Sequence, residues 1–285
     1  MTRPLVMGIL NVTPDSFSDG GRYMDVRKAI ARAEALAEEG ADILDIGGES
    51  TRPGAEPVDE AEEIARVVPV IAALRGRGVR ISVDTMKPDV ARAAVAAGAA
   101  MWNDVSALRW SEESPATAAQ LGCEVVLMHM QGEPRTMQEE PFYRDVVGEV
   151  AGFLGQRADA AMAAGVPRDR IWLDPGIGFG KHMIDHNLPL LAGLDLVVSL
   201  GWPVLLGASR KRFITALDPT ATARFRRLGP VIQDQEPRYR LGGSIAAALA
   251  GAASGVAAVR VHDVQPTVQA LAVWEAIAQA GGRAS

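Results

Sequence analysis

The sequence predicts a (β/α)8 barrel, the TIM-barrel fold class, and three observations support it. Eight short apolar runs are spread along the 285 residues, and each ends at a polar or glycine-flanked signature. Segments rich in Ala, Leu, Glu and Arg separate the runs, with the apolar spacing of amphipathic helices. Strands that alternate with helices form a parallel sheet, and eight such units in one chain fit a closed barrel. No linker rich in Pro and Ser divides residues 1–285, so we expect one domain.

Each predicted strand is defined by its apolar run and by the residues that follow it. In chain order the runs are 5–10 before Asn11, 43–46 before Gly47 and Gly48, 81–83 before Asp84, 101–102 before Asn103 and Asp104, 125–128 before His129, 171–173 before Asp174, 204–206 before Gly207 and Ser209, and 258–261, which contains Arg260, before His262. Residues 26–39, 60–75 and 266–280 show the helical spacing most clearly.

Polar side chains therefore collect at the ends of the predicted strands. Asp and Asn after a strand are ordinary turn formers and helix caps, so a single one would carry no information. Here a carboxamide, carboxylates, cations and an imidazole stand at many of the eight ends. Reactive groups of a (β/α)8 barrel gather at the carboxyl ends of its strands. The sequence thus predicts a functional site at that end of the barrel.

The composition narrows the class of protein. A hydrophobic content of 48% and a net charge of −6 are typical of a globular protein and disfavour nucleic acid or an anionic membrane as partner. The start of the chain lacks an apolar signal segment, and residues 245–259 fall short of the roughly 20 apolar residues of a membrane span. The lone Cys123 cannot form an internal disulfide. We therefore expect a cytoplasmic protein, with the proline-containing, basic segment 215–240 as a surface insertion.

Loop motifs extend beyond what the fold requires and resemble those of a known family. The longest are NVTPDSFSDGG at 11–21, DIGGESTRPG at 45–54 and GASRK at 207–211, joined by SVDT at 82–85, NDVS at 103–106, DPGIGFG at 174–180 and RVHD at 260–263. Together, in order from Met7 to Val264, they resemble dihydropteroate synthase. That family condenses 6-hydroxymethyl-7,8-dihydropterin diphosphate with 4-aminobenzoate in folate biosynthesis, releasing pyrophosphate with the help of Mg²⁺. The resemblance implies a transferase, a homodimer and a sulfonamide target.

A reduced pterin offers ring N–H and amino donors beside carbonyl and ring-nitrogen acceptors. Buried carboxylates, an amide and a cation can pair with these groups. The resemblance places the pterin on Asp84, Asn103, Asp174, Gly207 and Lys211. It also places Arg260 over the ring face, where a planar guanidinium stacks better than an ammonium. Met128 either lines this pocket or is plain core packing, and the sequence leaves both open.

The diphosphate needs hydrogen-bond donors, positive charge and a metal ion. The resemblance assigns it to Asn11, Thr51, Arg52 and His262. Asn11 would offer an oxygen to Mg²⁺, which keeps several waters and takes further oxygens from phosphate. Asn11 could instead be a helix cap, and a lone His262 could be a core imidazole. The position of His262 between Arg260 and Asp263 favours anion binding.

Bond breaking at the pterin methylene needs no protein nucleophile, because loss of pyrophosphate leaves a carbocation that the pterin stabilises. The protein's work is then electrostatic, and we assign it to Asp84, Lys211, Asp19 and Arg52. Asp19 could approach the cation on a loop with glycine hinges at Gly20 and Gly21. The carboxylates of Asp15 and Asp19 could equally stabilise turns.

The aminobenzoate must be held by its carboxylate and its ring. Ser209 can donate to the carboxylate close to the start of a predicted helix. The resemblance completes this site with Phe17, Thr51, Pro53, Phe179 and Lys211. His129 has no role that we can assign, and His182 and His186 lack a third ligand for a metal.

Two alternatives are another enzyme of the pterin-binding barrel kind and, from a different class, a protein without catalytic activity. A methyltransferase that passes a methyl group from a reduced folate to a corrinoid partner would share the carboxylates, but it would not need Ser209 or the Thr51–Arg52 turn. A non-catalytic pterin-binding protein would be favoured by loss of the assigned polar residues, yet all are present. Fold alone does not separate these classes.

Overall fold

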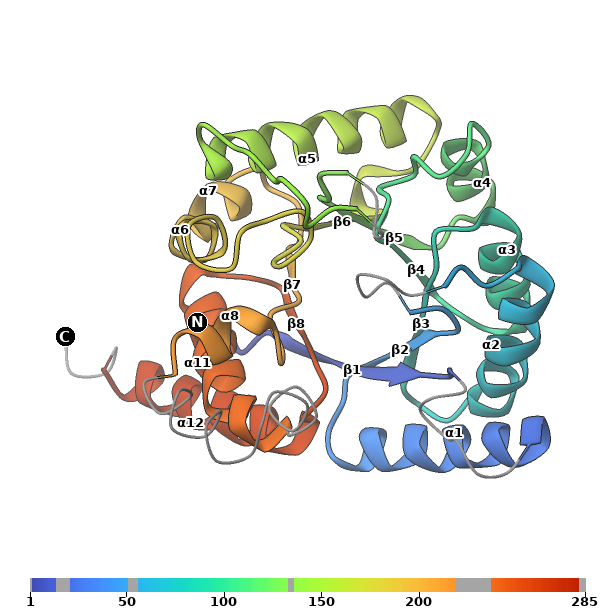
Figure 1. Cartoon of the computed structure of the whole chain (residues 1–285). Coiled ribbons are helices and arrows are strands. Elements are labelled where there is room, and N and C mark those ends of the chain that lie inside the picture. The colour runs from blue at the N-terminus through green and yellow to red at the C-terminus, as the bar shows by residue number, and fades with distance from the viewer. Residues whose placement is uncertain (1, 14–20, 51–55, 133–135, 219–236, 282–285) are drawn as a thin grey trace.

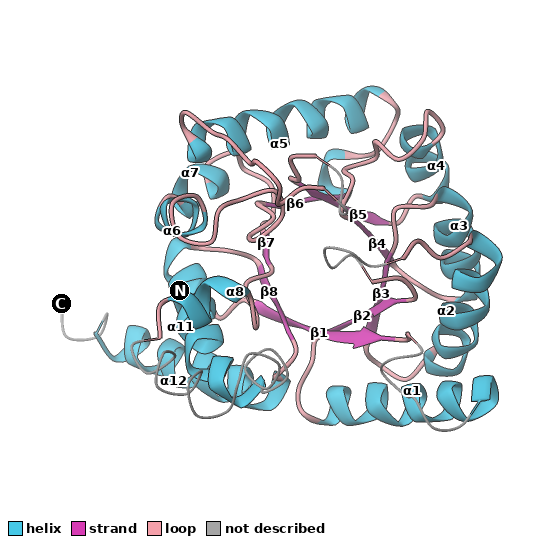
Figure 2. Ribbon diagram, in the orientation of Figure 1, coloured by secondary structure: helices cyan, strands magenta, loops and turns pink. Residues whose placement is uncertain are grey.

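The computed structural model shows a closed ring of parallel strands surrounded by helices, viewed along the barrel axis in Figure 1 and by element type in Figure 2. The strands are β1 (Leu5–Asn11), β2 (Ile43–Gly47), β3 (Arg80–Asp84), β4 (Met101–Asp104), β5 (Glu124–Met128), β6 (Ile171–Asp174), β7 (Leu205–Leu206) and β8 (Ala258–Val261). They pair in the order β6-β5-β4-β3-β2-β1-β8-β7, and a parallel bridge between Leu173 and Val204 joins β6 to β7. The structure describes residues 2–13, 21–50, 56–132, 136–218 and 237–281. The predicted (β/α)8 barrel is confirmed.

Helices follow the strands around the outside of the ring. They are α1 (Gly21–Glu38), α2 (Glu60–Leu74), α3 (Pro88–Ala97), α4 (Ser114–Leu121), α5 (Val146–Ala163), α6 (Asn187–Ala192), α7 (Leu194–Val198), α8 (Arg212–Ala216), α11 (Leu241–Ser254) and α12 (Val264–Gly281), with short 3-10 turns η2 (Arg168–Arg170) and η3 (Pro237–Arg240). The side chain of Asp59 caps α2 by accepting from the Glu62 N–H at 2.9 Å. Among the described residues, no helix is long and apolar enough to cross a membrane.

An apolar plug fills the lower interior of the barrel. Its buried members are Met7, Ile43, Met101, Val126, Trp172, Leu205 and Ala258, one from each of seven strands. The neighbouring strand residues, such as Val6, Leu44 and Trp102, belong instead to the larger core between strands and helices. This division follows from the alternation of side chains along a strand.

The same alternation places a polar layer directly above the plug. A residue two positions beyond a plug residue faces the same interior, one step nearer the carboxyl end of its strand. In chain order these residues are Ile9, Asp45, Asn103, Met128, Asp174, Gly207 and Arg260. On the remaining strand, Asp84 lies beside both Gly47 and Asn103 in the register. The interior therefore changes from apolar to polar at its carboxyl end, where the sequence predicts the site.

Candidate active site

Four polar side chains from β2, β3, β4 and β8 form one network in this layer. The Asn103 Nδ2 donates to Asp45 Oδ2 at 2.9 Å. The Arg260 Nε donates to the same oxygen at 2.6 Å, and its Nη2 donates to Asp84 Oδ2 at 2.6 Å. The second carboxylate oxygens of Asp45 and Asp84 are buried and have no donor among the described residues. The network thus holds acceptors at the mouth of the barrel that protein groups in the described ranges leave unpaired.

Burial governs the electrostatics of this network. It raises the pKa of Asp84 to about 7, against the attraction of Arg260, and the charges of Asp45, Glu63 and Asp104 raise it further. Burial acts to lower the pKa of Arg260, but Asp45 and Asp84 outweigh it, so that pKa lies above its usual value. Arg260 is therefore always charged, whereas Asp84 changes its charge close to neutral pH.

Asp174 at the end of β6 lies beside the network. Its Oδ1 accepts from the Gly176 N–H at 2.7 Å. Burial raises its pKa to about 6, opposed by that hydrogen bond and by the positive charges of Lys211, Arg260 and Lys181. A Cβ added to Gly207 would lie 3.7 Å from Asp174 Oδ2, so the glycine leaves space next to this carboxylate.

Lys211 extends from the loop after β7 toward the loop after β6. Its Nζ lies 4.1 Å from the centroid of the Phe179 ring, within the range of a cation–π contact. A Cβ added to Gly178 would lie 3.2 Å from Lys211 Cδ, so the lysine stem packs on that glycine. Met128 is buried in a small cluster with Phe179 and other methionines, separate from the main core. Lys211, which is predicted to bind the pterin, therefore lies against Phe179, which is predicted to bind the aminobenzoate.

The turn at 209–211 is fixed by residues that the sequence did not single out. Arg210 adopts a left-handed φ of 57° and forms a bidentate ion pair with Asp263 at 3.0 and 2.6 Å. Its N–H donates to Ser244 Oγ at 2.9 Å. Ser209 Oγ lies 3.1 Å from His262 Nδ1 and accepts from the His262 N–H at 3.2 Å. The ion pair thus sets the positions of the flanking Ser209 and Lys211.

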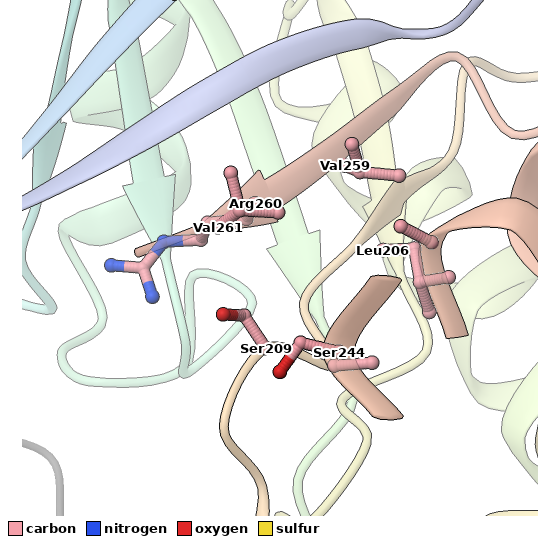
Figure 3. A pocket seen from close by; sticks show the side chains of 8 residues that line it. Leu206, Ser209, Ser244, Val259, Arg260 and Val261 are labelled. Atoms are coloured by element: carbon pink, nitrogen blue, oxygen red, sulfur yellow. The ribbon is translucent and has the colours of Figure 1, made fainter. Parts of the chain in front are cut away.

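Figure 3 shows Ser209, Ser244 and Arg260 among the residues that line a gap between β7, β8 and α11. This gap is too narrow for a water molecule.

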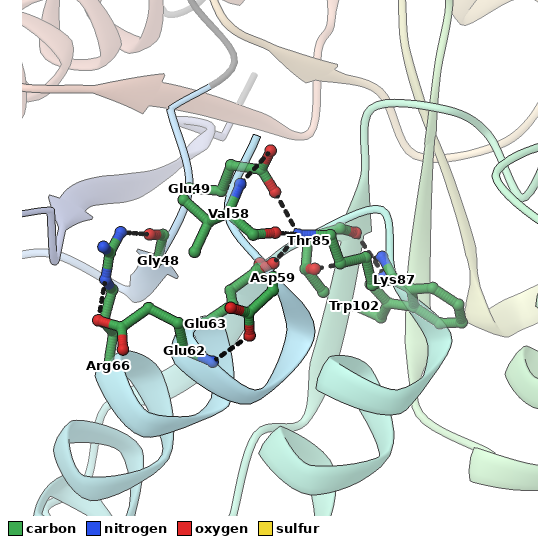
Figure 4. Close-up of polar contacts among 10 residues, drawn as sticks. All are labelled: Gly48, Glu49, Val58, Asp59, Glu62, Glu63, Arg66, Thr85, Lys87 and Trp102. Carbon is green, nitrogen blue, oxygen red and sulfur yellow. Dashed lines mark hydrogen bonds and ion pairs between the residues drawn. The ribbon is translucent and has the colours of Figure 1, made fainter. Parts of the chain in front are cut away.

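The ends of the loop after β2 are held by a second buried cation, Lys87 (Figure 4). Its Nζ donates to Glu49 Oε2 at 2.5 Å, to the Val58 carbonyl at 2.5 Å and to Glu63 Oε2 at 2.7 Å. Burial raises the pKa of the fully buried Glu63, against the hydrogen bond from Lys87. Arg66 holds the start of the same loop, since its Nη1 donates to the Gly48 carbonyl at 2.8 Å. We call Lys87, Arg66 and their partners the anchor of this loop.

Several predicted residues fall elsewhere. Phe17, Asp19, Thr51, Arg52 and Pro53 lie outside the described residues, and their roles stay predictions. Asn11 is half-buried at the end of β1, paired with Gly47 in the register. The structure brings together, at one end of the barrel, Asp84, Asn103, Met128, Asp174, Gly207, Lys211 and Arg260.

Sequence reasoning assigned no role to Asp45, Lys87 or Arg210, although Asp45 and Arg210 stand in the quoted loop motifs. Asp45 was available from the pattern, because it stands two residues beyond the plug residue Ile43, as Asn103 stands beyond Met101. Its place inside an apolar run concealed it. Lys87 and Arg210 carry no such signal, since their partners are distant in the chain.

The chain is similar to known proteins over almost its whole length. Residues 7–262 match the family model described as pterin binding enzyme. The dihydropteroate synthase of Neisseria meningitidis serogroup B is 48% identical over 282 residues, covering 97% of this chain and 94% of its own. The solved structure of Xanthomonas albilineans dihydropteroate synthase with 4-aminobenzoic acid is 51% identical, with a TM-score of 0.85 over 96% of this chain and 93% of that one. The Xanthomonas albilineans structure in complex with 7,8-dihydropteroate is 49% identical, with a TM-score of 0.82 over 96% and 94%.

The barrel and its mouth of carboxylates, amide and cations define the class of pterin-binding barrel enzymes. Within this class, the chain belongs to the dihydropteroate synthase family. It is accordingly a transferase of folate biosynthesis, and the resemblance seen in its loop motifs is confirmed.

Proposed function

We propose that this chain joins 6-hydroxymethyl-7,8-dihydropterin diphosphate to 4-aminobenzoate by a loose, dissociative substitution assisted by Mg²⁺. The observation that carries the proposal is the polar layer above the barrel plug, where two buried carboxylate oxygens have no donor among the described residues. Buried acceptors without donors are costly, so this layer is built for a ligand that brings N–H groups. The relatives solved with 4-aminobenzoic acid and with 7,8-dihydropteroate support the choice of ligand.

The geometry suggests how each group meets the pterin. Because Asn103 Nδ2 donates to Asp45, its Oδ1 is the atom left to accept from the ring. Asp174 keeps Oδ2 for a ring donor, since its Oδ1 accepts from Gly176. Lys211 supplies the donor for the carbonyl side. Arg260, held at two of its nitrogens by carboxylates, is stiff enough to cover one ring face.

The second substrate would lie between the loops after β6 and β7. Ser209, whose Oγ lies 3.1 Å from His262 Nδ1, would donate to its carboxylate, and the Phe179 ring beside Lys211 would pack against its ring. Phe17, Thr51 and Pro53 would close the remaining sides.

In the reaction, the C–O bond at the pterin methylene breaks and its electron pair leaves with pyrophosphate. The amine nitrogen then bonds to the carbon and loses one of its protons to water. Asp84 and Asp19 would stabilise the cation, while Arg52, His262 and Lys211 would stabilise the departing charge. When bound with the diphosphate, Mg²⁺ would neutralise part of that charge.

The donor chemistry fits a metal that arrives with the diphosphate. Mg²⁺ accepts amide oxygens, keeps several waters and borrows phosphate oxygens. Asn11 supplies an amide at the carboxyl end of β1. Among the described residues, no group of three or more His, Cys, Asp or Glu could hold a metal by itself.

An isotope experiment tests the dissociative step. The diphosphate, labelled with ¹⁸O at the oxygen bridging carbon and phosphorus, is incubated with the protein and Mg²⁺ without aminobenzoate. We expect the label to move into non-bridging positions of the recovered substrate, because cation and pyrophosphate form and recombine. A protein that makes dihydropteroate when aminobenzoate is added, yet leaves the label in place, would rule out this mechanism.

A homodimer and a cytoplasmic location are further proposals. An apolar groove of about 550 Å³ between α6, α8 and α11 is lined by Leu188, Leu191, Phe213, Leu217 and other residues, and Leu217 is half exposed. A second copy of the chain would cover such a groove, and light scattering in solution gives the mass directly. The single, buried Cys123 supports a reducing compartment.

A further inference from the structure

A buried lysine and a buried histidine lie behind the site and have no part in the mechanism above. Lys181 Nζ lies 2.9 Å from His129 Nδ1, and the two residues are only 1% and 6% exposed. They come from the loops after β6 and β5. The same Nζ donates to the carbonyl oxygens of Gly176 at 2.9 Å and Phe179 at 3.0 Å. Three acceptors thus match the three donors of one ammonium group.

The protonation states fit this arrangement. Burial lowers the pKa of His129 to about 3, so its ring is neutral and Nδ1 can accept. Burial lowers the pKa of Lys181 to about 7, and the nearby charge of Asp174 opposes that decrease. A neutral imidazole and a lysine with three acceptors form a consistent donor–acceptor set.

One arm of this arrangement leads to Asp174. The Gly176 carbonyl accepts from Lys181, while the Gly176 N–H donates to Asp174 Oδ1 at 2.7 Å. The backbone N–H of His129 donates to the Asp174 carbonyl at 2.9 Å, so the residue that carries the imidazole is itself paired with Asp174. The Lys181 side chain therefore holds the Gly176 peptide, whose N–H orients the Asp174 carboxylate, and the His129 imidazole acts on it through Lys181.

The other arm leads to Phe179 and Lys211. The Phe179 carbonyl accepts from Lys181, and its ring lies against the Lys211 ammonium. Gly178, in the same turn, packs on the Lys211 stem. A shift of the turn 176–179 would therefore move the wall of the aminobenzoate site as well as the pterin carboxylate.

We propose that Lys181 and His129 are positioning residues that couple the two substrate sites, by holding the turn 176–179 to Asp174 on one side and to Phe179 on the other. The inference rests on the proposed roles of Asp174 and Phe179. Its specific consequence is that loss of the pair weakens both substrates together. A purely structural role would reduce the folded fraction, and hence kcat, without changing either KM.

Two variants test the proposal in the full chain. Lys181→Met keeps the length of the side chain and removes its three donors. His129→Phe keeps a ring against Phe153, which it contacts edge to face at 4.8 Å, and removes the acceptor. We expect the KM of both substrates to rise roughly ten-fold in Lys181→Met, the scale of a lost charged hydrogen bond, and less in His129→Phe.

Arg157→Met is the matched control. Arg157 also donates to two loop carbonyls, those of Ala107 at 2.9 Å and Leu108 at 3.3 Å, from a half-buried position. None of the hydrogen bonds described above links this loop to Asp174 or Phe179. The loss of Arg157 should lower the melting temperature and leave both KM values within two-fold of the unaltered protein.

The outcomes separate cleanly. Elevated KM values for both substrates in folded Lys181→Met and His129→Phe, with the control unchanged, support the proposal. Values within two-fold of the unaltered protein, or an increase for only one substrate, overturn it. If Lys181→Met does not fold, His129→Phe decides alone. If the unaltered chain forms no dihydropteroate, the proposed function fails, and calorimetric binding of 7,8-dihydropteroate and of 4-aminobenzoate to each variant tests the coupling by itself.

Discussion

Asp45 shows how one buried residue can orient two others. One of its two carboxylate oxygens, Oδ2, accepts from both Asn103 and Arg260, so Asp45 decides which atom of the Asn103 amide turns toward the ligand. An amide in its place would lack the negative charge that holds the Arg260 guanidinium, and it would put N–H donors where one of the two carboxylate oxygens now accepts. The role of Asn103 as an acceptor therefore depends on Asp45, whose other oxygen, Oδ1, is one of the two buried acceptors left for the ligand.

Asp45→Asn should weaken pterin binding by about 1–3 kcal/mol, a factor of roughly 5 to 150 in affinity, because Asn103 and Arg260 lose their fixed orientation. Calorimetric titration with 7,8-dihydropteroate measures it. Asp104→Asn is the control, since Asp104 is equally buried but accepts from the N–H groups of Ser106 and Leu108, away from the pocket. Equal losses of affinity in both variants would contradict the orienting role.

Pterin affinity should depend on pH through two carboxylates. The pKa values of Asp84 and Asp174 are raised to about 7 and about 6, and each must be ionised to accept fully from the ring. Affinity should therefore be complete above pH 7 and decline as the pH falls through 7 to 6. Binding of 7,8-dihydropteroate, which carries no phosphate, isolates this titration. Affinity that stays constant from pH 8 to 5 would show that neither carboxylate titrates there.

Which site residues could be predicted depends on where their partners lie. Asp84, Asn103 and Asp174 stand at strand ends, where the chemistry is visible in the sequence. Asp45 sits within an apolar run and became visible only when the plug residue Ile43 fixed which face of β2 points inward. Lys87 has partners 24 to 38 residues away, a separation that no local pattern reports.

At the scale of elements, the loops that follow the neighbouring strands β5 and β6 are held by a close approach of their backbones. Gly176 has a positive φ of 66°, and an added Cβ would lie 1.9 Å from the His129 carbonyl oxygen. Gly76 has a similar φ of 78°, with nothing within 4 Å of an added Cβ. At both positions a side chain would have to adopt a similar unfavourable backbone conformation, but only at Gly176 would it also collide with the neighbouring backbone.

Gly176→Ala should destabilise the protein by about 1–3 kcal/mol more than Gly76→Ala. This is the usual cost of inserting an extra carbon into a packed region, where the backbone must shift. Urea unfolding of both variants measures the difference in the free energy of unfolding. Similar values would mean that the loops after β5 and β6 are free to separate, and the close approach inferred between them would be wrong.

The anchor at Lys87 predicts a second effect on stability. Lys87→Met leaves Glu63 buried without its cation, at a cost of about 3–5 kcal/mol. Because burial already raises the pKa of Glu63, the variant should be most affected at pH 8 and less at pH 5, where the carboxyl takes up a proton. Thermal unfolding at both pH values tests this.

Adding Glu63→Gln to Lys87→Met removes the stranded charge and should restore part of the loss. Arg92→Met, in an exposed ion pair, is the control and should have little effect. A loss that is independent of pH and is not relieved in the double variant would contradict the account.

Element types were easier to predict than element ends. The apolar run 204–206 becomes a strand only at Leu205–Leu206, because Val204 pairs through a single bridge. The helix expected from residue 26 already begins at Gly21. Within the expected insertion 215–240, the described ends belong to α8 and η3. The ends of helices and strands are set by pairing and packing between segments distant in the chain. The local spacing of apolar residues does not encode these contacts.

At the scale of the whole molecule, the barrel divides its interior between stability and chemistry. Seven strands contribute to the apolar plug, and the next inward residues form the polar layer. The plug gives a rigid floor, so the carboxylates, amide and guanidinium above it keep the geometry that a ligand must match. The fold was predictable because this step recurs on strand after strand.

The most direct test of the central claim is the synthesis itself. The purified full chain is incubated with the pterin diphosphate, 4-aminobenzoate and Mg²⁺, and 7,8-dihydropteroate and pyrophosphate are quantified by mass spectrometry and an enzymatic assay. We expect the two products in equal amounts, and no sustained pyrophosphate release when aminobenzoate is left out. Folded protein that yields no dihydropteroate above background would contradict the account.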